Sequence, residues 1–378
     1  MTPAPQPPTG PRRAAGRTAR IAGIVLALSL LGGGCSPITS PSSSARAAAG
    51  HVPSLSEVEP LADPRAWDGV VDIALPEPDL EPVAKVPEPR LPVTVTDAQG
   101  TEVTVEDASR ILALDIHGTL SQTVFELGLG DRVVGRDTSS QFEAIADRPL
   151  VTSNGHELNA EAILALDPTV VLTDTSLGPW DAVLQLRDAG IPVVVTDSRR
   201  SLDNLAALTS EVADALGVPA AGRRLGRRIT AEAEAMQEAI SRVAPEDVTG
   251  RLRTVFLYVR GSSGVYYMFG QDSGADSLIE AVGGYDVSKE IGWKGMRPLT
   301  DEGLVAAQPD VVLMMSKGLE SVGGVDGLLE RFPALGQTPA GEHERIVAMD
   351  DDRILSFGPS TAEVLNALAV ALYAPDAL

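Results

Sequence analysis

Short apolar runs of strand length recur along the chain from residue 91 onward, and helix-like segments separate them. These runs cover residues 111–115, 133–137, 170–174, 192–197 and 253–261, and the last strands and a final helix lie within 345–373. Strands that alternate with helices favour a parallel sheet with crossover helices. Over residues 92–105 apolar and polar residues alternate around a short turn, which predicts a hairpin. The pattern therefore predicts an α/β fold from about residue 91.

Two stretches of the chain repeat nearly the same pattern. Residues 158–172 read LNAEAILALDPTVVL and residues 299–313 read LTDEGLVAAQPDVVL, with the same residue at 7 of 15 positions. Each copy predicts a helix, a proline stop and then a buried strand. The offset of 141 residues is too long for a solenoid, whose repeats are roughly 20–50 residues. The repeat therefore indicates two similar lobes.

A long helical pattern lies between the two copies, from residue 220 to about 243. A helix of this length spans roughly 35 Å and predicts a rigid connection. We therefore expect two Rossmann-like α/β lobes, at residues 91–217 and 246–378, joined by one long α-helix within 218–245. Two lobes around a cleft are a natural arrangement for binding a ligand.

The first 35 residues have the pattern of a targeting segment. Arginines precede an apolar run at 21–31, and three glycines then lead into Cys35. The run is too short to span a membrane, and the pattern resembles a bacterial lipoprotein signal peptide, 1–35, whose cysteine is acylated. A plain secretory signal with an incidental cysteine is the alternative. Residues 36–90 are rich in Ser, Pro and Ala, which predicts a disordered tether. We therefore expect a lipid-anchored protein on the extracytoplasmic face of the cell membrane.

Composition excludes several classes of function. The net charge of −22 over 378 residues argues against nucleic-acid binding, which needs a basic surface. The single cysteine allows neither an intramolecular disulfide nor a cysteine-based zinc site. The sequence has no glycine-rich phosphate loop, triad spacing or paired-carboxylate motif. It therefore favours a binding protein over an enzyme.

In open α/β sheets ligands bind beyond the carboxyl ends of the strands, so the loops there are the first places to search. His117 follows one strand, and His156 lies in the loop before the first repeat helix. A neutral histidine there is a potential metal ligand, although a surface-loop histidine is the simpler interpretation.

Tyr258 and Arg260 lie on one strand face. A guanidinium beside a phenol favours the phenolate, which is a ligand for ferric iron; a strand tyrosine beside an extended arginine remains possible.

Glu161 and Glu302 occupy the same position of the repeat, in the first turn of each predicted helix. Favourable interaction with the helix dipole explains each glutamate singly. It does not explain why both lobes have the glutamate where neighbouring residues differ.

Taken together, the signal-like Cys35, the tether, the two lobes, the long helix and the repeated glutamates resemble the rigid-helix class of ABC-transporter substrate-binding proteins. The segments GHELNAEAILALDPTVVL and LYVRG more narrowly resemble the haem-binding lipoproteins of actinobacterial haem importers. The resemblance covers about residues 91–378.

This resemblance implies a protein that captures haem outside the cell and delivers it to a permease dimer with its ATPase. It implies that His156 and Tyr258 are the axial ligands of the haem iron and that Arg260 supports Tyr258, with His117 as a competing ligand. It further implies that Glu161 and Glu302 dock onto the permease. A ferric siderophore or cobalamin is the alternative ligand for the same fold.

Further cleft residues are expected from their chemistry. Haem propionates are anionic, and Lys294 and Arg297 lie in a candidate cleft loop. Apolar walls are expected from Met268, Trp293, Met296 and Phe357.

Overall fold

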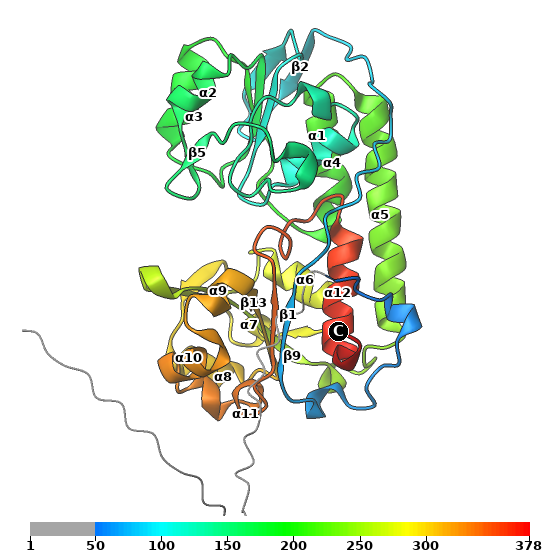
Figure 1. Cartoon of the computed structure of the whole chain (residues 1–378), viewed down its shortest axis with the longest axis vertical. Helices are drawn as coiled ribbons and strands as arrows, with labels where there is room; N and C mark the ends of the chain where they lie inside the picture. The colour runs from blue at the N-terminus through cyan, green and yellow to red at the C-terminus, as the bar shows by residue number, and fades with distance from the viewer. Residues whose placement is uncertain (1–49) are drawn as a thin grey trace, which may run out of the picture. The chain divides into compact units, whose positions relative to one another are not determined.

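The computed structural model describes residues 50–378 (Figure 1), so Cys35 and the signal-like segment lie outside the described residues. The described part contains two α/β lobes and a long helix, α5 (Pro219–Ser241), which packs against α4 in the first lobe and α12 in the second. The predicted fold class is therefore confirmed. Within residues 50–378 no helix is both long enough and apolar enough to cross a membrane.

The first lobe is built on a parallel sheet with the strand order β4-β7-β8. Every residue of these strands is buried, which is typical of parallel sheets covered on both faces. The strands of this lobe are β2 (Val93–Thr96), β3 (Glu102–Val105), β4 (Ile111–Leu114), β5 (Thr152–Ser153), β6 (Glu157–Leu158), β7 (Val170–Thr173) and β8 (Val193–Val195). Its helices are α1 (Thr119–Glu126), α2 (Ala160–Ala165), α3 (Trp180–Asp188) and α4 (Leu205–Ala215).

The predicted hairpin forms as β2 and β3, but the run at 133–137 does not form a regular strand. It makes only isolated bridges, from Val133 to Ile111 and from Arg136 to Leu150. Gly135 allows this segment to pass close to the Leu166 side chain, because a Cβ atom at Gly135 would lie only 2.6 Å from it. The segment therefore follows the edge of β4 without a continuous ladder.

The second lobe has a mixed sheet with the order β1-β14-β13-β9-β10-β12, and β11 pairs with β9. Neighbours from β1 to β9 run parallel, whereas β10 and β12 are antiparallel. The strands are β1 (Val70–Ile73), β9 (Arg253–Arg260), β10 (Val265–Phe269), β11 (Tyr285–Asp286), β12 (Met296–Pro298), β13 (Val311–Met315) and β14 (Ile346–Met349). The helices are α6 (Ala275–Ala281), α7 (Val287–Glu290), α8 (Asp301–Ala307), α9 (Ser316–Glu320), α10 (Gly324–Arg331), α11 (Pro339–Glu342) and α12 (Thr361–Tyr373).

The expectation of a disordered tether is wrong for its described part, residues 50–90. Strand β1 lies in this segment and pairs in parallel with β14, with Val70 opposite Ile346. Leu55 and Ile73 are buried in the main hydrophobic cluster. Composition alone misses this strand because it is short and its partner lies far away in the sequence.

The main hydrophobic cluster extends through both lobes and the linking helix. Leu225 and Ile229 of α5 belong to the same buried cluster as Val212 of α4 and Leu368 of α12. The lobes also meet where the Gln122 amide donates a hydrogen bond of 2.7 Å to the Ser360 hydroxyl. The helix is therefore part of both cores, and it fixes how far the two lobes lie apart.

We expect Ile73→Ala to lower the free energy of unfolding by about 2–4 kcal/mol, as large-to-small substitutions in a core do. Ile73 is only 2% exposed. Val86→Ala, in the same segment but with Val86 67% exposed, should change it by less than about 0.5 kcal/mol. Urea titration of residues 50–378 measures both. If Ile73→Ala lowered the free energy of unfolding no more than Val86→Ala does, the segment would contribute nothing to the stability of the second lobe.

Candidate functional site

A cavity of about 810 Å³ lies between the lobes. On the first-lobe side its lining residues follow the carboxyl ends of strands, as Ile116 and His117 follow β4 and Thr175 and Ser176 follow β7. On the second-lobe side they come from β9, β10 and the loops after β13 and β14. The cavity therefore lies at the strand ends where the sequence analysis expects a ligand.

His156 lines this cavity from the end of the short hairpin formed by β5 and β6. The turn before it needs left-handed backbone, with φ of 46° at Asn154 and 90° at Gly155. Glycine adopts this conformation without strain. Partial removal from water lowers the pKa of the His156 imidazole, and the positive charge of Arg260 lowers it further. His156 is thus held near the opposite lobe in a form suited to metal coordination.

His117 also lines the cavity, so the competing histidine is not excluded by position. Burial, followed by the charge of Arg200, lowers the pKa of His117 to about 4. Its loop is fixed by Asp115, whose carboxylate accepts a hydrogen bond of 3.0 Å from the Leu120 backbone. The two histidines therefore differ in position, with His156 in a hairpin turn and His117 in the loop after β4.

Beneath the first-lobe wall lies a buried charged cluster that the sequence analysis missed. Arg200 donates to Asp115 at 2.9 Å and to Asp174 at 2.7 Å. Burial and the charge of Asp115 raise the pKa of neighbouring Asp137 to about 7. A signal was present, because the apolar runs before Asp115, Asp137, Asp174 and Asp197 each end in aspartate. The cluster ties these strand ends together and keeps the cleft loops in place.

Tyr258 and Arg260 lie together on the second-lobe wall, as the strand pattern predicts. The Arg260 guanidinium stacks over the Tyr258 ring, with Cζ 4.5 Å from the ring centroid. Nη1 of Arg260 donates to the Val259 carbonyl at 2.8 Å, and Nη2 forms an ion pair of 2.5 Å with Asp351. Arg260 therefore contacts Tyr258 through the face of the aromatic ring.

The rest of this wall is aromatic and comes from β10, which is antiparallel to β9. Tyr267 lies opposite Tyr258 in the register, and the Phe269 ring stacks on Tyr258 at 5.7 Å. Both Tyr267 and Phe269 line the cavity. The prediction of Met268 as a wall residue is wrong, because alternate strand residues face opposite sides. Met268 is fully buried in a separate hydrophobic cluster.

Of the other predicted wall residues, Met296 lines the cavity and Trp293 and Phe357 do not. Trp293 packs over α8, where a Cβ atom at Gly303 would lie 2.9 Å from its ring. Phe357 is buried in the main core. The predicted propionate partners Lys294 and Arg297 are exposed and outside the cavity lining.

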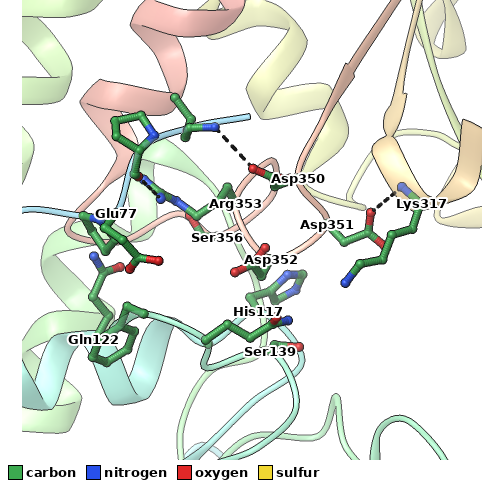
Figure 2. Close-up of a pocket in the computed structure, with 16 residues that line it drawn as sticks. Glu77, His117, Gln122, Ser139, Lys317, Asp350, Asp351, Asp352, Arg353 and Ser356 are labelled. Atoms are coloured by element: carbon green, nitrogen blue, oxygen red, sulfur yellow. Dashed lines mark hydrogen bonds between the residues drawn. The ribbon is translucent and has the colours of Figure 1, made fainter. Parts of the chain in front are cut away.

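A smaller polar cavity of about 330 Å³, drawn in Figure 2, has six lining residues in common with the first: His117, Ser139, Gln141, Lys317, Asp351 and Asp352. Lys317 is the cationic cleft residue that the sequence analysis missed. The repeat provides the signal, because Lys317 lies 141 residues after Ser176, which also lines the large cavity. In both lobes a residue shortly after the repeat strand thus lines the cavity.

Glu161 and Glu302 are exposed in the first turns of α2 and α8. Asn159 and Thr300 cap these helices in the same way, each accepting a hydrogen bond from the backbone three residues later. One helical turn after each glutamate lies an exposed apolar residue, which the repeat also matches. These are Leu164, 39% exposed, and Val305, 45% exposed.

Two α/β lobes, a rigid connecting helix and a cavity at the strand ends of both lobes define a ligand-binding protein of the cleft type. The family model described as periplasmic binding protein matches residues 116–353. The chain belongs to this family. The prediction of a substrate-binding protein rather than an enzyme is therefore confirmed.

Several known proteins are similar to this chain. The crystal structure of the heme binding protein HmuT is 42% identical, with a TM-score of 0.78, covering 83% of this chain and all of that one. Structures of HmuT variants with alanine at a histidine, a tyrosine or an arginine match with TM-scores of 0.78 to 0.79. An ABC transporter substrate-binding lipoprotein of Bacillus subtilis (strain 168), YvrC, is 25% identical, covering 75% of this chain and 86% of its own. A cobalamin-binding protein of Halobacterium salinarum is 27% identical, covering 75% of this chain and 74% of its own.

Proposed function

We propose that this protein binds one ferric haem outside the cell and delivers it to the permease of an ABC importer. The observation that carries the proposal is the position of His156 and Tyr258, which line one cavity from opposite lobes. A flat macrocycle between them would have one potential iron ligand on each face. Phenolate is a known ligand of ferric haem iron, and neutral imidazole is another.

The cavity suits such a ligand in size and lining. Its volume of about 810 Å³ lies within the usual range of roughly 300–1,000 Å³ for small-molecule sites. Tyr267, Phe269 and Met315 supply apolar surface beside Tyr258. The Arg260 guanidinium lies over the Tyr258 ring, with Cζ 4.5 Å from the ring centroid, and so places a positive charge beside a tyrosine that would carry negative charge as a ligand of ferric iron.

The similar structures support the same assignment. HmuT is a heme binding protein by name, and its substituted tyrosine and arginine are two positions apart, as Tyr258 and Arg260 are here. Cobalamin is the second candidate ligand, because the relative from Halobacterium salinarum binds it. An axial tyrosine with a stacked arginine has no evident use for cobalamin, and we therefore favour haem.

We expect Tyr258→Phe to weaken hemin binding at least about tenfold, which is about 1.4 kcal/mol. The substitution removes the anionic ligand and keeps the ring that stacks on Phe269. His156→Ala should leave a weaker complex with an altered visible spectrum, because water can replace a neutral ligand. Arg260→Ala should weaken binding and Arg260→Lys should partly restore it. Hemin titration followed by absorbance measures all four.

The chain offers matched controls for both ligands. Tyr267→Phe removes a hydroxyl from the same wall, and His117→Ala removes the competing histidine. Neither should shift the haem spectrum. A spectrum altered by His117→Ala and unaffected by His156→Ala would reassign the first-lobe ligand. If none of these substitutions alters it, the ligand is not axially bound haem, and cobalamin or a siderophore becomes the better candidate.

Docking to the permease is assigned to Glu161 and Glu302. Each glutamate is exposed at a matching site of its lobe and has an exposed apolar residue one turn later. Neither carboxylate makes a hydrogen bond or ion pair within residues 50–378. A matching acidic and apolar pair on two lobes suits a symmetric dimer with basic residues at each half.

Reversing both charges, with Glu161→Lys and Glu302→Lys, should reduce haem uptake by cells at least about tenfold. Hemin binding by the purified protein should not change, because neither residue lines the cavity. Asp181→Lys with Asp326→Lys is the matched control, since both are exposed acidic residues in the first turns of α3 and α10. Unchanged uptake by the first pair would leave only the helix-dipole role.

The membrane anchor is assigned to Cys35, which lies outside the described residues. The similarity to a substrate-binding lipoprotein supports this assignment. Cell fractionation of wild type and Cys35→Ala tests it: the wild type should be found with membranes and the variant should be released. Equal retention of both would mean that another feature holds the protein.

A further inference from the structure

Lys317 occupies the junction of the two cavities. It lies just after β13, at the start of α9, and lines the large cavity as well as the polar one, in which Figure 2 shows it. The two residues of the large cavity that carry a permanent positive charge are Arg260 and Lys317. These two side chains are therefore the cationic candidates for pairing with an anionic group on a ligand.

The two cations differ in what already neutralises them. Arg260 is held by Asp351 in an ion pair of 2.5 Å. The Lys317 ammonium makes no hydrogen bond or ion pair within residues 50–378; it is the backbone N–H of Lys317 that donates to Asp351, at 3.1 Å. A side chain with three donors is thus left unpaired at the cavity surface.

The backbone around Lys317 is held against the ligand wall. At Gly318 a Cβ atom would lie 2.9 Å from the Val259 carbonyl oxygen and 3.3 Å from Nη1 of Arg260. Only glycine allows α9 to begin this close to β9. Lys317 therefore lies next in sequence to a residue that packs against Arg260, which stacks on Tyr258.

Among residues 50–378, none of the acidic side chains that line the large cavity, Asp272, Asp351 and Asp352, forms an ion pair with the Lys317 ammonium. Asp351 is occupied by Arg260, and burial raises the pKa of Asp352, which disfavours its charged form. Asp272 also lines the large cavity and comes from the segment after β10.

We propose that Lys317 is a carboxylate-binding subsite, which pairs with a side-chain carboxylate of the bound macrocycle. The inference rests on the proposed function and deepens it, because it defines which macrocycles the site prefers. A charge-assisted hydrogen bond in a partly dry cleft favours a ring with carboxylates at its edge. A ring whose edge carries neutral amides or esters gains nothing from it. Lys317 takes the role that the sequence suggested for Lys294 and Arg297.

The test compares hemin with hemin dimethyl ester, which keeps the iron and the ring but has no free carboxylate. Each compound is titrated, in the same detergent-containing buffer, into the protein fragment of residues 50–378 and into three variants of it: Lys317→Gln, Lys317→Arg and Lys294→Gln. Wild type should bind hemin about tenfold more tightly than the ester. Lys317→Gln should abolish this ratio by weakening hemin alone, whereas Lys317→Arg and Lys294→Gln should keep it.

Each other outcome overturns a defined statement. If wild type binds hemin and its ester equally, or if Lys317→Gln keeps the ratio, Lys317 is not a carboxylate subsite and the proposed function stands. If Lys294→Gln abolishes the ratio, the carboxylate binds at the exposed loop instead. If wild type binds neither compound, the proposed function fails and this inference fails with it.

Discussion

The geometry of the cleft depends on the burial of one helix in two cores. α5 contributes Leu225 and Ile229 to a hydrophobic cluster that also contains α4 and α12. A helix packed this way cannot rotate relative to either lobe without exposing apolar side chains, at a cost of about 1.5–3 kcal/mol for each large one. The separation of the lobes is consequently set by the core, and His156 and Tyr258 are held on facing walls before a ligand arrives.

The two walls of the cleft are built from different elements and present different side chains. The first-lobe wall consists of loops, and a buried Arg200 with its aspartates fixes those loops from below. The second-lobe wall combines loops with strand faces, where the backbone ladder fixes Tyr258 against Tyr267 and Phe269. Loops offer adaptable polar groups, while strands offer rigid aromatic surface. A cofactor-like ligand with polar edges and an apolar plane would find both.

The sequence is most informative where local pattern decides the structure. The repeat reveals both lobes, and the spacing of Tyr258 and Arg260 shows that they share a strand face. The same alternation, applied to VYYMF, would have selected Tyr267 and Phe269 in place of Met268. Pairing over long distances is not visible in this way: β1 looks like a linker because its partner begins 276 residues later, at Ile346. The sequence analysis names Lys294 and misses Lys317, because the position of a lysine in a predicted loop does not show whether its side chain faces the cavity.

The pairing of β1 with β14 has a consequence for how the chain matures. The edge strand of the second lobe, β1, comes from residues 70–73. Its partner β14 and the last α-helix, α12, lie within residues 346–373. Synthesis proceeds from the N-terminus, so the first lobe can fold while the second still lacks β14 and α12. Contacts between such distant segments close slowly. The lobe that carries Tyr258 is accordingly the last to fold, and the cleft is complete only after β14 and α12 have been synthesised.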